Sequence, residues 1–213
     1  MGTYSKSTFG KIAGAVGEGV GSSWRGIKVI RSLPTKSGKP ATALQLAVYA
    51  RLALSAAYLS PIKDILNIGF GDKKLKKITG YNAAVRAFLD EAITGNYPDH
   101  GVDLSKIRMS KGALETAEVS MRPLENNIVL SWPVDITNVR SFVDDKMIFV
   151  IFNENKNTYK LNNSFTRNDG EISIPFPGKP NDLLHIWSFC AKRDEKMVSN
   201  SVYLGTIIVP FSL

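Results

Sequence analysis

The sequence predicts an α+β protein in which glycine-rich N-terminal β-strands and two helices precede a C-terminal immunoglobulin-like or fibronectin type III-like β-sandwich. Two observations support this fold class. Glycines crowd residues 10–21, ahead of a Val- and Ile-rich run. Beyond residue 104, short runs of strand-forming residues alternate with clusters of Asn, Asp, Gly and Pro, which favour turns. We therefore expect an N-terminal region over residues 1–103 and a sandwich domain over residues 104–213.

The glycine-rich region, GKIAGAVGEGVGSSWRGIKVIRS at residues 10–32, predicts closely packed strands. A helix is unfavourable there, because each glycine costs about 1 kcal/mol relative to alanine at a helical position. Val and Ile in its second half favour extended backbone, and glycine lets a neighbouring backbone or ring approach closely. We predict a subunit contact in this region. Its close-approach positions are Gly17, Gly19 and Gly21, and its anchoring side chains are Trp24, Ile27, Val29 and Ile30.

Two helices are predicted after the linker LPTKSGKP at residues 33–40. The first follows Thr42 as N-cap, has apolar residues at helical three- and four-residue spacing, and should stop at Pro61. The second is predicted over residues 81–94, with a glycine after it as its stop. Between the two helices lies a basic cluster that consists of Lys73, Lys74, Lys76 and Lys77.

Short strands are predicted throughout the C-terminal region. The seven candidates are KIRMSKGAL, NIVLSWPV, KMIFVIFNE, TYKLNNSF, EISIPFP, LLHIWSFCAK and MVSNSVYLGTIIV. A series of this number, with Trp132 early and Trp187 late, is typical of an immunoglobulin-like sandwich.

The formal net charge of +8 belongs to the N-terminal half: residues 1–115 contain 17 Lys and Arg against 8 Asp and Glu, and residues 116–213 contain 10 against 11. The basic cluster at residues 73–77 could contact nucleic acid, because clustered lysines attract phosphate. Aromatic residues are not interleaved with these lysines, and no helix-turn-helix, zinc-finger or RNP signature is present. A solvated basic face is therefore favoured over a nucleic-acid contact.

The sequence indicates no cofactor site. A dinucleotide fingerprint needs the order GxGxxG, whereas GAVGEGVG has the order GxxGxGxG and precedes a strand-like run. Neither Gly-Lys pair, at residues 10–11 and 38–39, continues as a P-loop. Cys190 is the single cysteine, so an intramolecular disulfide and a cysteine-based zinc site are both excluded. We expect this thiol to be a small buried side chain.

Catalytic and metal-binding residues are equally sparse, and we expect no enzyme. Histidine-based catalysis would need His100 or His185. His185 lies in a predicted strand, where a packed structural role is expected. His100 lies near Asp99 and Asp103, which would allow a two-carboxylate, one-histidine metal site, but the Pro-Asp-His-Gly order favours a turn and we expect no metal. The Asp pair at residues 144–145 is expected to be a solvated loop pair.

The N-terminus lacks the apolar core of a secretory signal, and no uninterrupted apolar run approaches the length of a membrane span. We therefore expect no membrane insertion and a protein that is cytoplasmic as synthesised. Action outside the cell would need another export route, such as lysis or a dedicated secretion machine.

Three ordered segments carry a resemblance to a known family: the stretch from MGTYSKSTFGKIAGAVGEGVGSSWRGIKVIRS to LSPI, then YNAAVRAFLDEAITGNYPDHGVDLSKIRMSKGAL, then VSNSVYLGTIIV. Together they resemble a family of uncharacterised proteins from Bacteroidota, known only as a domain of unknown function, over essentially the whole chain. The resemblance implies a bacterial origin and no assigned activity. The first helix departs from the family's Gln-rich, Arg-containing pattern, since only Gln45 and Arg51 remain.

We expect a structural or self-assembling protein whose N-terminal strand segment pairs with a neighbouring copy, because an unpaired strand can add to another chain's sheet. Repetition of such a contact gives a filament or a closed ring. Two alternatives stay open. In one, the segment folds back as a local hairpin onto its own sandwich. In the other, the protein is a cell-surface or virion-associated module that binds carbohydrate, protein or nucleic acid.

Overall fold

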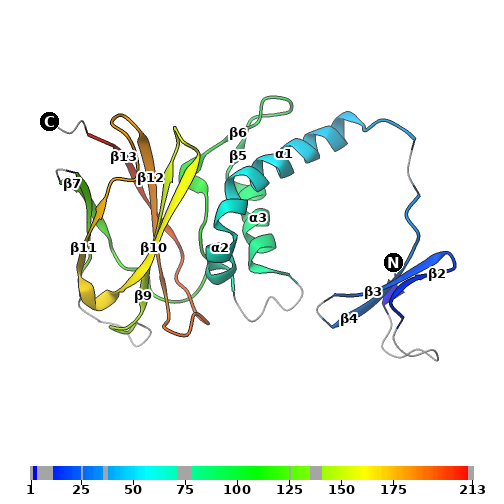
Figure 1. Ribbon diagram of the computed structural model, residues 1–213, viewed down its shortest axis with the longest axis horizontal. Helices are drawn as coiled ribbons and strands as arrows, with labels where there is room; N and C mark the ends of the chain where they lie inside the picture. The colour runs from blue at the N-terminus through cyan, green and yellow to red at the C-terminus, as the bar shows by residue number, and fades with distance from the viewer. Residues whose placement is uncertain are drawn as a thin grey trace. The chain divides into compact units, whose positions relative to one another are not determined.

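A computed structural model describes residues 2–3, 12–24, 26–35, 38–71, 78–124, 126–134 and 141–210. The chain forms two compact units, residues 1–43 and residues 44–213 (Figure 1). The division that the sequence suggests, after residue 103, falls inside the second unit. Helices and sandwich strands belong together there because they line one hydrophobic core.

The N-terminal unit is a four-stranded antiparallel sheet with the strand order β1-β4-β3-β2. Its strands are β1 (Gly2–Thr3), β2 (Gly14–Val16), β3 (Gly19–Trp24) and β4 (Ile27–Ser32). Tight turns join β2 to β3 and β3 to β4, and Gly17 (φ 58°) and Gly26 (φ 82°) adopt left-handed backbone in them. Glycine populates this conformation at little cost, whereas other residues are strained there.

Three α-helices, one more than predicted, begin the second unit. They are α1 (Ala43–Leu59), α2 (Lys63–Gly69) and α3 (Gly80–Glu91), with the 3₁₀ turn η1 (Ser60–Ile62) between the first two. The first helix ends at Leu59, just before Pro61 as expected, but the helical path does not stop there. The proline lies in the first positions of η1, where its missing N–H has no intrahelical partner to lose, so the helical path continues into α2. Helix α3 begins after Thr79, whose hydroxyl accepts a hydrogen bond from the Asn82 backbone N–H at 3.1 Å.

The predicted second helix ends too late, since residues 93–94 already form a strand. This strand, β5 (Ile93–Thr94), pairs with β6 (Gly101–Val102), and the 3₁₀ turn η2 (Leu104–Lys106) follows.

Two antiparallel sheets form the sandwich. The first has the order β11-β8-β7 and the second the order β10-β9-β12-β13. Their strands are β7 (Ser120–Leu124), β8 (Asn127–Ser131), β9 (Lys146–Asn153), β10 (Thr158–Thr166), β11 (Glu171–Pro175), β12 (Leu183–Ala191) and β13 (Val202–Ile208), with the 3₁₀ turn η3 (Arg167–Asp169) before β11. The predicted α+β class with N-terminal strands and an immunoglobulin-like β-sandwich is thereby confirmed.

One of the predicted strands is wrong. KIRMSKGAL contains the end of η2 and an extended loop, in which Leu114 makes an isolated bridge to Ser199. The missing strand is β7, whose sequence SMRPL is too polar to show a clear alternation. Its Pro123 is tolerated because β7 is an edge strand, which has no ladder partner on one side.

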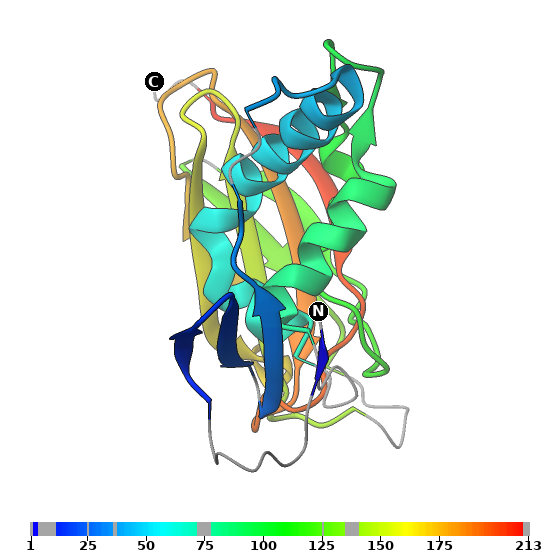
Figure 2. The same cartoon turned by 90° about the vertical axis from the view of Figure 1, so that its right-hand side faces the viewer.

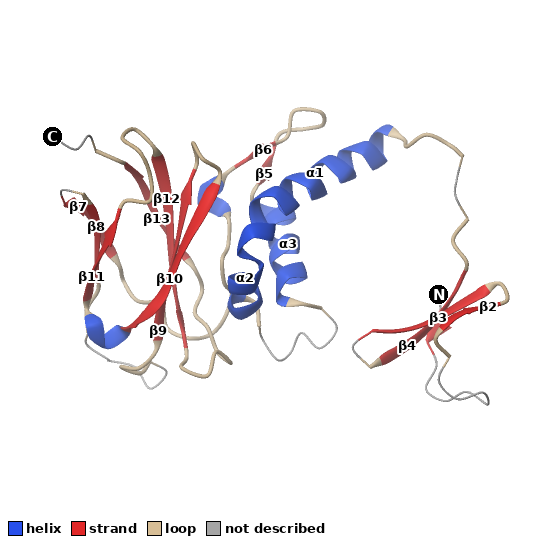
Figure 3. Ribbon diagram, in the orientation of Figure 1, coloured by secondary structure: helices blue, strands red, loops and turns tan. Residues whose placement is uncertain are grey.

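The second unit has three layers, and the four-stranded sheet is the middle one (Figures 1, 2 and 3). One face of this sheet packs against β8 and β11 through Leu130, Phe149 and Ile186. Its other face packs against the helices, where Phe152 and Trp187 join a core with residues of α1, α2 and α3. Strands β9 and β12 are therefore buried on both faces, which explains their nearly unbroken apolar runs KMIFVIFN and LLHIWSFCA.

Candidate interaction surfaces

The register of the N-terminal sheet brings most of the predicted anchoring side chains to one face. Trp24 pairs directly with Ile27, and Ser22 pairs with Val29. Directly paired residues of an antiparallel ladder lie on the same face, and alternate residues of one strand share it. We call this face the Trp24 face; it consists of Ala15, Val20, Ser22, Trp24, Ile27, Val29 and Arg31.

The fourth predicted anchor, Ile30, lies on the opposite face beside Gly21. A Cβ atom at Gly21 would lie 2.5 Å from Cγ2 of Ile12, so a close approach requires glycine at this position. The other two predicted close-approach glycines differ. Gly17 serves a turn and has open space around it, and a Cβ at Gly19 would make only ordinary contacts, at 3.5 Å or more.

The N-terminal unit buries little of its apolar surface. Gly21 is the buried residue of this unit among residues 12–24, 26–35 and 38–43, and the others are half-buried or exposed. Trp24 is 48% exposed. A sheet with one apolar face normally buries that face against another layer, and small sheets are only marginally stable without one. The Trp24 face is therefore a candidate contact surface.

Strand β4, the last part of the N-terminal segment that the sequence predicts to pair with a neighbouring chain, lies inside this sheet. It pairs with β3 along its whole length and with β1 at Val29 and Ile30. A contact with another copy would therefore use the face of the sheet or its short outer strands.

The edges of the sandwich are poorly suited to strand addition. Edge strand β10 has a register shift between Asn162 and Phe165, and edge strand β13 lies opposite another shift, with Gly205 at φ 115°. Pro123 in β7 and Pro175 at the end of β11 remove backbone donors from the other two edges. Bulges and edge prolines are devices that prevent another strand from pairing.

Helix α1 carries a second apolar surface that the sequence interpretation missed. Ser55 and Leu59 of this helix are buried against the rest of the second unit. The same stripe continues toward the start of the helix, where Leu44 is 82%, Val48 is 51% and Leu52 is 43% exposed. We call these three residues the α1 stripe. The sequence signal for this surface is the four-residue spacing of these residues, which indicates an apolar helix face but does not show whether that face is covered.

The continuous helical stretch Ala43–Gly69 is long and apolar enough to cross a membrane, because it contains an 18-residue window with a mean hydropathy of 1.2. Length and composition alone are weak support for a membrane span. The second half of this stretch lies in the core, since Leu59, Ile62 and Leu66 are at most 1% exposed. The part left free, roughly the first ten residues of α1, has a length of about 15 Å, which is half of a bilayer's hydrocarbon thickness.

The predicted phosphate-contacting lysines, Lys73, Lys74, Lys76 and Lys77, lie outside the residues that the structure describes.

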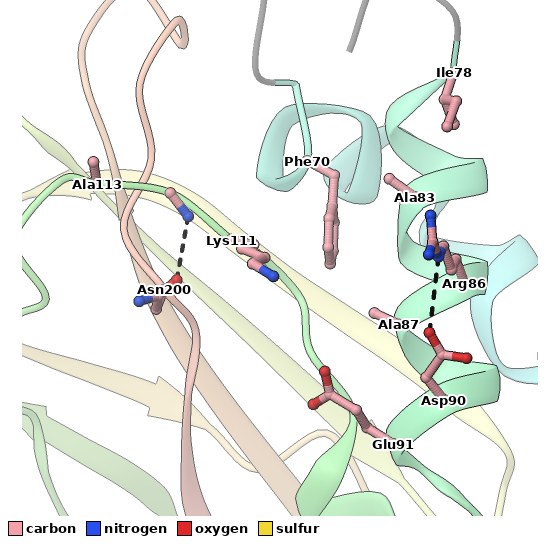
Figure 4. A pocket seen from close by; sticks show the side chains of 11 residues that line it. Phe70, Ile78, Ala83, Arg86, Ala87, Asp90, Glu91, Lys111, Ala113 and Asn200 are labelled. Carbon is pink, nitrogen blue, oxygen red and sulfur yellow. Dashed lines mark hydrogen bonds and ion pairs between the residues drawn. The ribbon is translucent and has the colours of Figure 1, made fainter. Parts of the chain in front are cut away.

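A cavity of about 720 Å³ lies between α3 and the loop that contains residues 111–113 (Figure 4). Its lining combines apolar Phe70, Ala83 and Ala87 with the charged residues Arg86, Asp90, Glu91 and Lys111. Asp90 lies 3.8 Å from Arg86, and Glu91 lies 2.5 Å from Arg108. This arrangement contains no pairing of a nucleophile with a base.

Neither candidate histidine lies in an arrangement that suggests catalysis. His185 places Nδ1 2.8 Å from the Tyr203 hydroxyl and Nε2 3.0 Å from a carboxylate oxygen of Glu154, within the aromatic core beside Trp187. His100 is half-buried next to Tyr97. No group of three His, Cys, Asp or Glu side chains among the described residues is arranged to hold a metal ion.

The Asp pair at residues 144–145 is not a solvated pair, which corrects the sequence interpretation. The side chain of Asp144 is 55% exposed, but that of Asp145 is completely buried and lies 3.4 Å from the Arg167 guanidinium. Burial raises the pKa of the Asp145 carboxyl, although Arg167 and the Phe142 backbone N–H oppose the shift. Burial also raises the pKa of the Cys190 thiol, as expected for a small buried side chain.

Comparison with protein families places the chain. A family described as "Family of unknown function (DUF6266)" matches residues 10–205. The chain belongs to this family. The match confirms the near full-length extent of the resemblance to an uncharacterised family, and it does not show a source in Bacteroidota.

Other comparisons add little for this DUF6266 member. No curated protein matches the chain. A solved structure of selenomethionine-substituted chicken interferon gamma receptor alpha chain is similar at 15% sequence identity and a TM-score of 0.37. The similarity covers 53% of this chain and 57% of the receptor chain. So distant a likeness carries no argument about activity or partners.

Proposed function

We propose that this DUF6266 protein is a non-enzymatic, self-assembling structural subunit whose N-terminal sheet contacts a neighbouring copy. The observation that carries the proposal is the apolar Trp24 face. The N-terminal unit does not cover this face with a core of its own, since Gly21 is the single buried residue among residues 12–24, 26–35 and 38–43. Because β4 is already paired within the chain, the contact is made by side chains of this face and not by addition of β4 to another sheet.

The chemistry of the face supports this role. Trp24, Ile27 and Val29 lie next to one another across β3 and β4, and Arg31 is the charged residue at its edge. Interfaces between proteins are typically built this way, with an aromatic or apolar centre and a charged rim. Repetition of such a contact from one copy to the next gives a ring or a filament.

A pair of charge variants tests the face directly. In Ile27→Lys/Val29→Lys, two ammonium groups would be buried in the contact without partners, at a cost of several kcal/mol each. Ser23→Lys/Ser32→Lys adds the same charge to the same strands on the opposite, exposed face. Light scattering after size exclusion, with negative-stain microscopy, should show assembly for the wild type and the control and loss of assembly for Ile27→Lys/Val29→Lys.

Deletion of residues 1–32 is a second test of the sheet contact, and its outcome does not depend on whether a charge variant folds. The truncated protein should stay folded, by circular dichroism, and should fail to assemble. A truncated protein that assembles like the full chain, or a wild-type protein that remains monomeric at high concentration, would show that the proposal is wrong.

The alternative proposal is a binding module built on a sandwich of the fibronectin type III kind, at a cell or virion surface. The sheet orders β11-β8-β7 and β10-β9-β12-β13 favour this finer fold assignment. A strictly monomeric protein that binds an immobilised glycan or protein ligand through its loops would support the module. A salt-sensitive DNA complex that is lost when Lys73, Lys74, Lys76 and Lys77 are neutralised would support a nucleic-acid version.

A further inference from the structure

We infer that the cavity between α3 and the loop at residues 111–113 binds an amphipathic monocarboxylate, with the carboxylate at Lys111 and the apolar body against Phe70 and α3. All residues that line this cavity belong to the second unit, whereas the Trp24 face belongs to the first. The inference therefore goes beyond the proposed sheet contact and does not depend on it.

One wall of the cavity is apolar because α3 presents small side chains there. Ala83 and Ala87 lie four residues apart, on the same side of the helix, and Phe70, which follows α2, lines the cavity with them (Figure 4). The volume of about 720 Å³ falls within the range of about 300–1,000 Å³ that is usual for small-molecule sites. A ligand with an apolar body of ordinary small-molecule size therefore matches this wall and this space.

The opposite wall is a loop whose backbone is fixed from two directions. The Lys111 N–H donates to the Gly69 carbonyl oxygen at 3.0 Å, and the Gly112 N–H donates to Oδ1 of Asn200 at 3.2 Å. A Cβ atom at Gly112 would collide with the Val198 carbonyl oxygen, so this close packing requires glycine. The Lys111 side chain therefore starts from a fixed backbone, and a site that is already ordered loses less freedom when a ligand binds.

The charges around the cavity favour an anion over a cation. Both carboxylates of the lining already have a cationic partner, since Asp90 lies 3.8 Å from Arg86 and Glu91 lies 2.5 Å from Arg108. Within the described part of the chain, Lys111 forms no ion pair, so its ammonium is the charge without a counterion. A ligand with one negative charge supplies that counterion.

A carboxylate fits this charge better than a phosphate monoester. A phosphate monoester carries nearly two negative charges at about pH 7, of which Lys111 would balance one. The second charge would then be repelled by the carboxylates of Asp90 and Glu91 in the same lining. We therefore assign the site to monocarboxylates.

Calorimetric titration of the full-length protein with sodium decanoate, below its micelle concentration, tests the inference. Decanoate should bind at a saturable site, and acetate, which has the carboxylate without the apolar body, should give no measurable binding. Decyltrimethylammonium, with the same chain and the opposite charge, should bind at least about tenfold more weakly. Absence of saturable decanoate binding, or equal affinity for the cationic compound, would overturn the inference.

Two variants locate the bound decanoate. Lys111→Ala removes the charged donor and should weaken binding about tenfold or more. Lys106→Ala is the matched control, because Lys106 does not line the cavity and its ammonium lies 3.1 Å from Asp103; its affinity should equal that of the wild type. Ala87→Phe should fill the cavity and abolish binding, with the fold checked by circular dichroism.

Lys111→Ala decides the question even if Ala87→Phe does not fold, because Lys111 is exposed and the backbone hydrogen bond of this residue is kept. Equal decanoate affinity in Lys111→Ala and the wild type would show that the inference is wrong. The exposed apolar surfaces provide the last control. Ile27→Lys/Val29→Lys on the Trp24 face and Leu44→Glu on the α1 stripe should both keep decanoate binding, and loss of binding in either would place the ligand outside the cavity.

Discussion

Replacement of Phe88 by alanine tests whether helices and sandwich unfold as one body. Phe88 lies on α3, is 1% exposed, and belongs to the core shared between the helices and the middle sheet. Its ring centroid is 6.0 Å from that of Tyr58 on α1, which in turn is 5.7 Å from that of Phe152 on β9. The Phe88→Ala cavity therefore opens at the junction of the helical layer and the sheet.

The expected magnitude follows from the burial of this ring. Phe→Ala changes at fully buried positions cost about 3–5 kcal/mol. Total stabilities of native domains are about 5–15 kcal/mol, so this is a large fraction of the whole. For a unit of this size, each kcal/mol lowers the melting temperature by about 2–4 °C, which predicts a fall of roughly 6–20 °C.

The assay follows thermal unfolding with two probes on the same sample. Far-UV circular dichroism reports the helices, and near-UV circular dichroism reports Trp132 and Trp187, which are buried on opposite faces of the middle sheet. Both signals should shift together in Phe88→Ala. Arg86→Ala is the control on the same helix: its side chain is 79% exposed, and its exposed ion pair with Asp90 contributes about 0.5 kcal/mol or less.

A split result would refute the reasoning. If the helical signal of Phe88→Ala melts early while the tryptophan signal keeps its wild-type midpoint, the helices form a domain of their own. The chain would then divide near residue 103, as the sequence alone suggested.

The remaining predictions concern buried polar groups. Arg167→Met should cost about 3–5 kcal/mol in urea unfolding, because it leaves the Asp145 carboxylate buried without its partner. Since burial raises the pKa of this carboxyl, the folded state holds its proton more tightly than the unfolded state. The loss of unfolding free energy in the variant, relative to the wild type, should therefore shrink as the pH falls from about 7 to about 4. A loss that is constant with pH would contradict this. The Cys190 thiol, 1% exposed and with a raised pKa, should react with a thiol reagent only after denaturation, and rapid labelling of the native protein would show that the core is open.

Much of the fold could be predicted from local patterns, and the failures have identifiable causes. Strands β9 and β12 were recognisable because burial on both faces produces long apolar runs. Strand β7 was missed because an exposed edge strand needs neither alternation nor freedom from proline. Helix α2 was missed because Pro61, normally a helix stop, begins a 3₁₀ turn that leads into it.

The candidate surfaces were predicted less well than the strands that form them. The sequence identified Trp24, Ile27, Val29 and Ile30 as anchors, but it could not assign them to faces without the register of β3 against β4. That register separates Ile30 from the other three. The same holds for the α1 stripe. Its apolar spacing predicts a buried helix face, but the sequence does not show whether other parts of the chain bury it.

The sequence by itself determined most of the elements: glycine-rich strands, an apolar first helix and a run of short sandwich strands. These are local properties, set by conformational preference and by the spacing of apolar residues. Only the tertiary structure decided which strands are interior, which carboxylate is buried, where the chain divides, and which apolar surfaces stay exposed. Those features depend on residues distant in the chain, such as Phe88 and Phe152, that come together only when the layers pack.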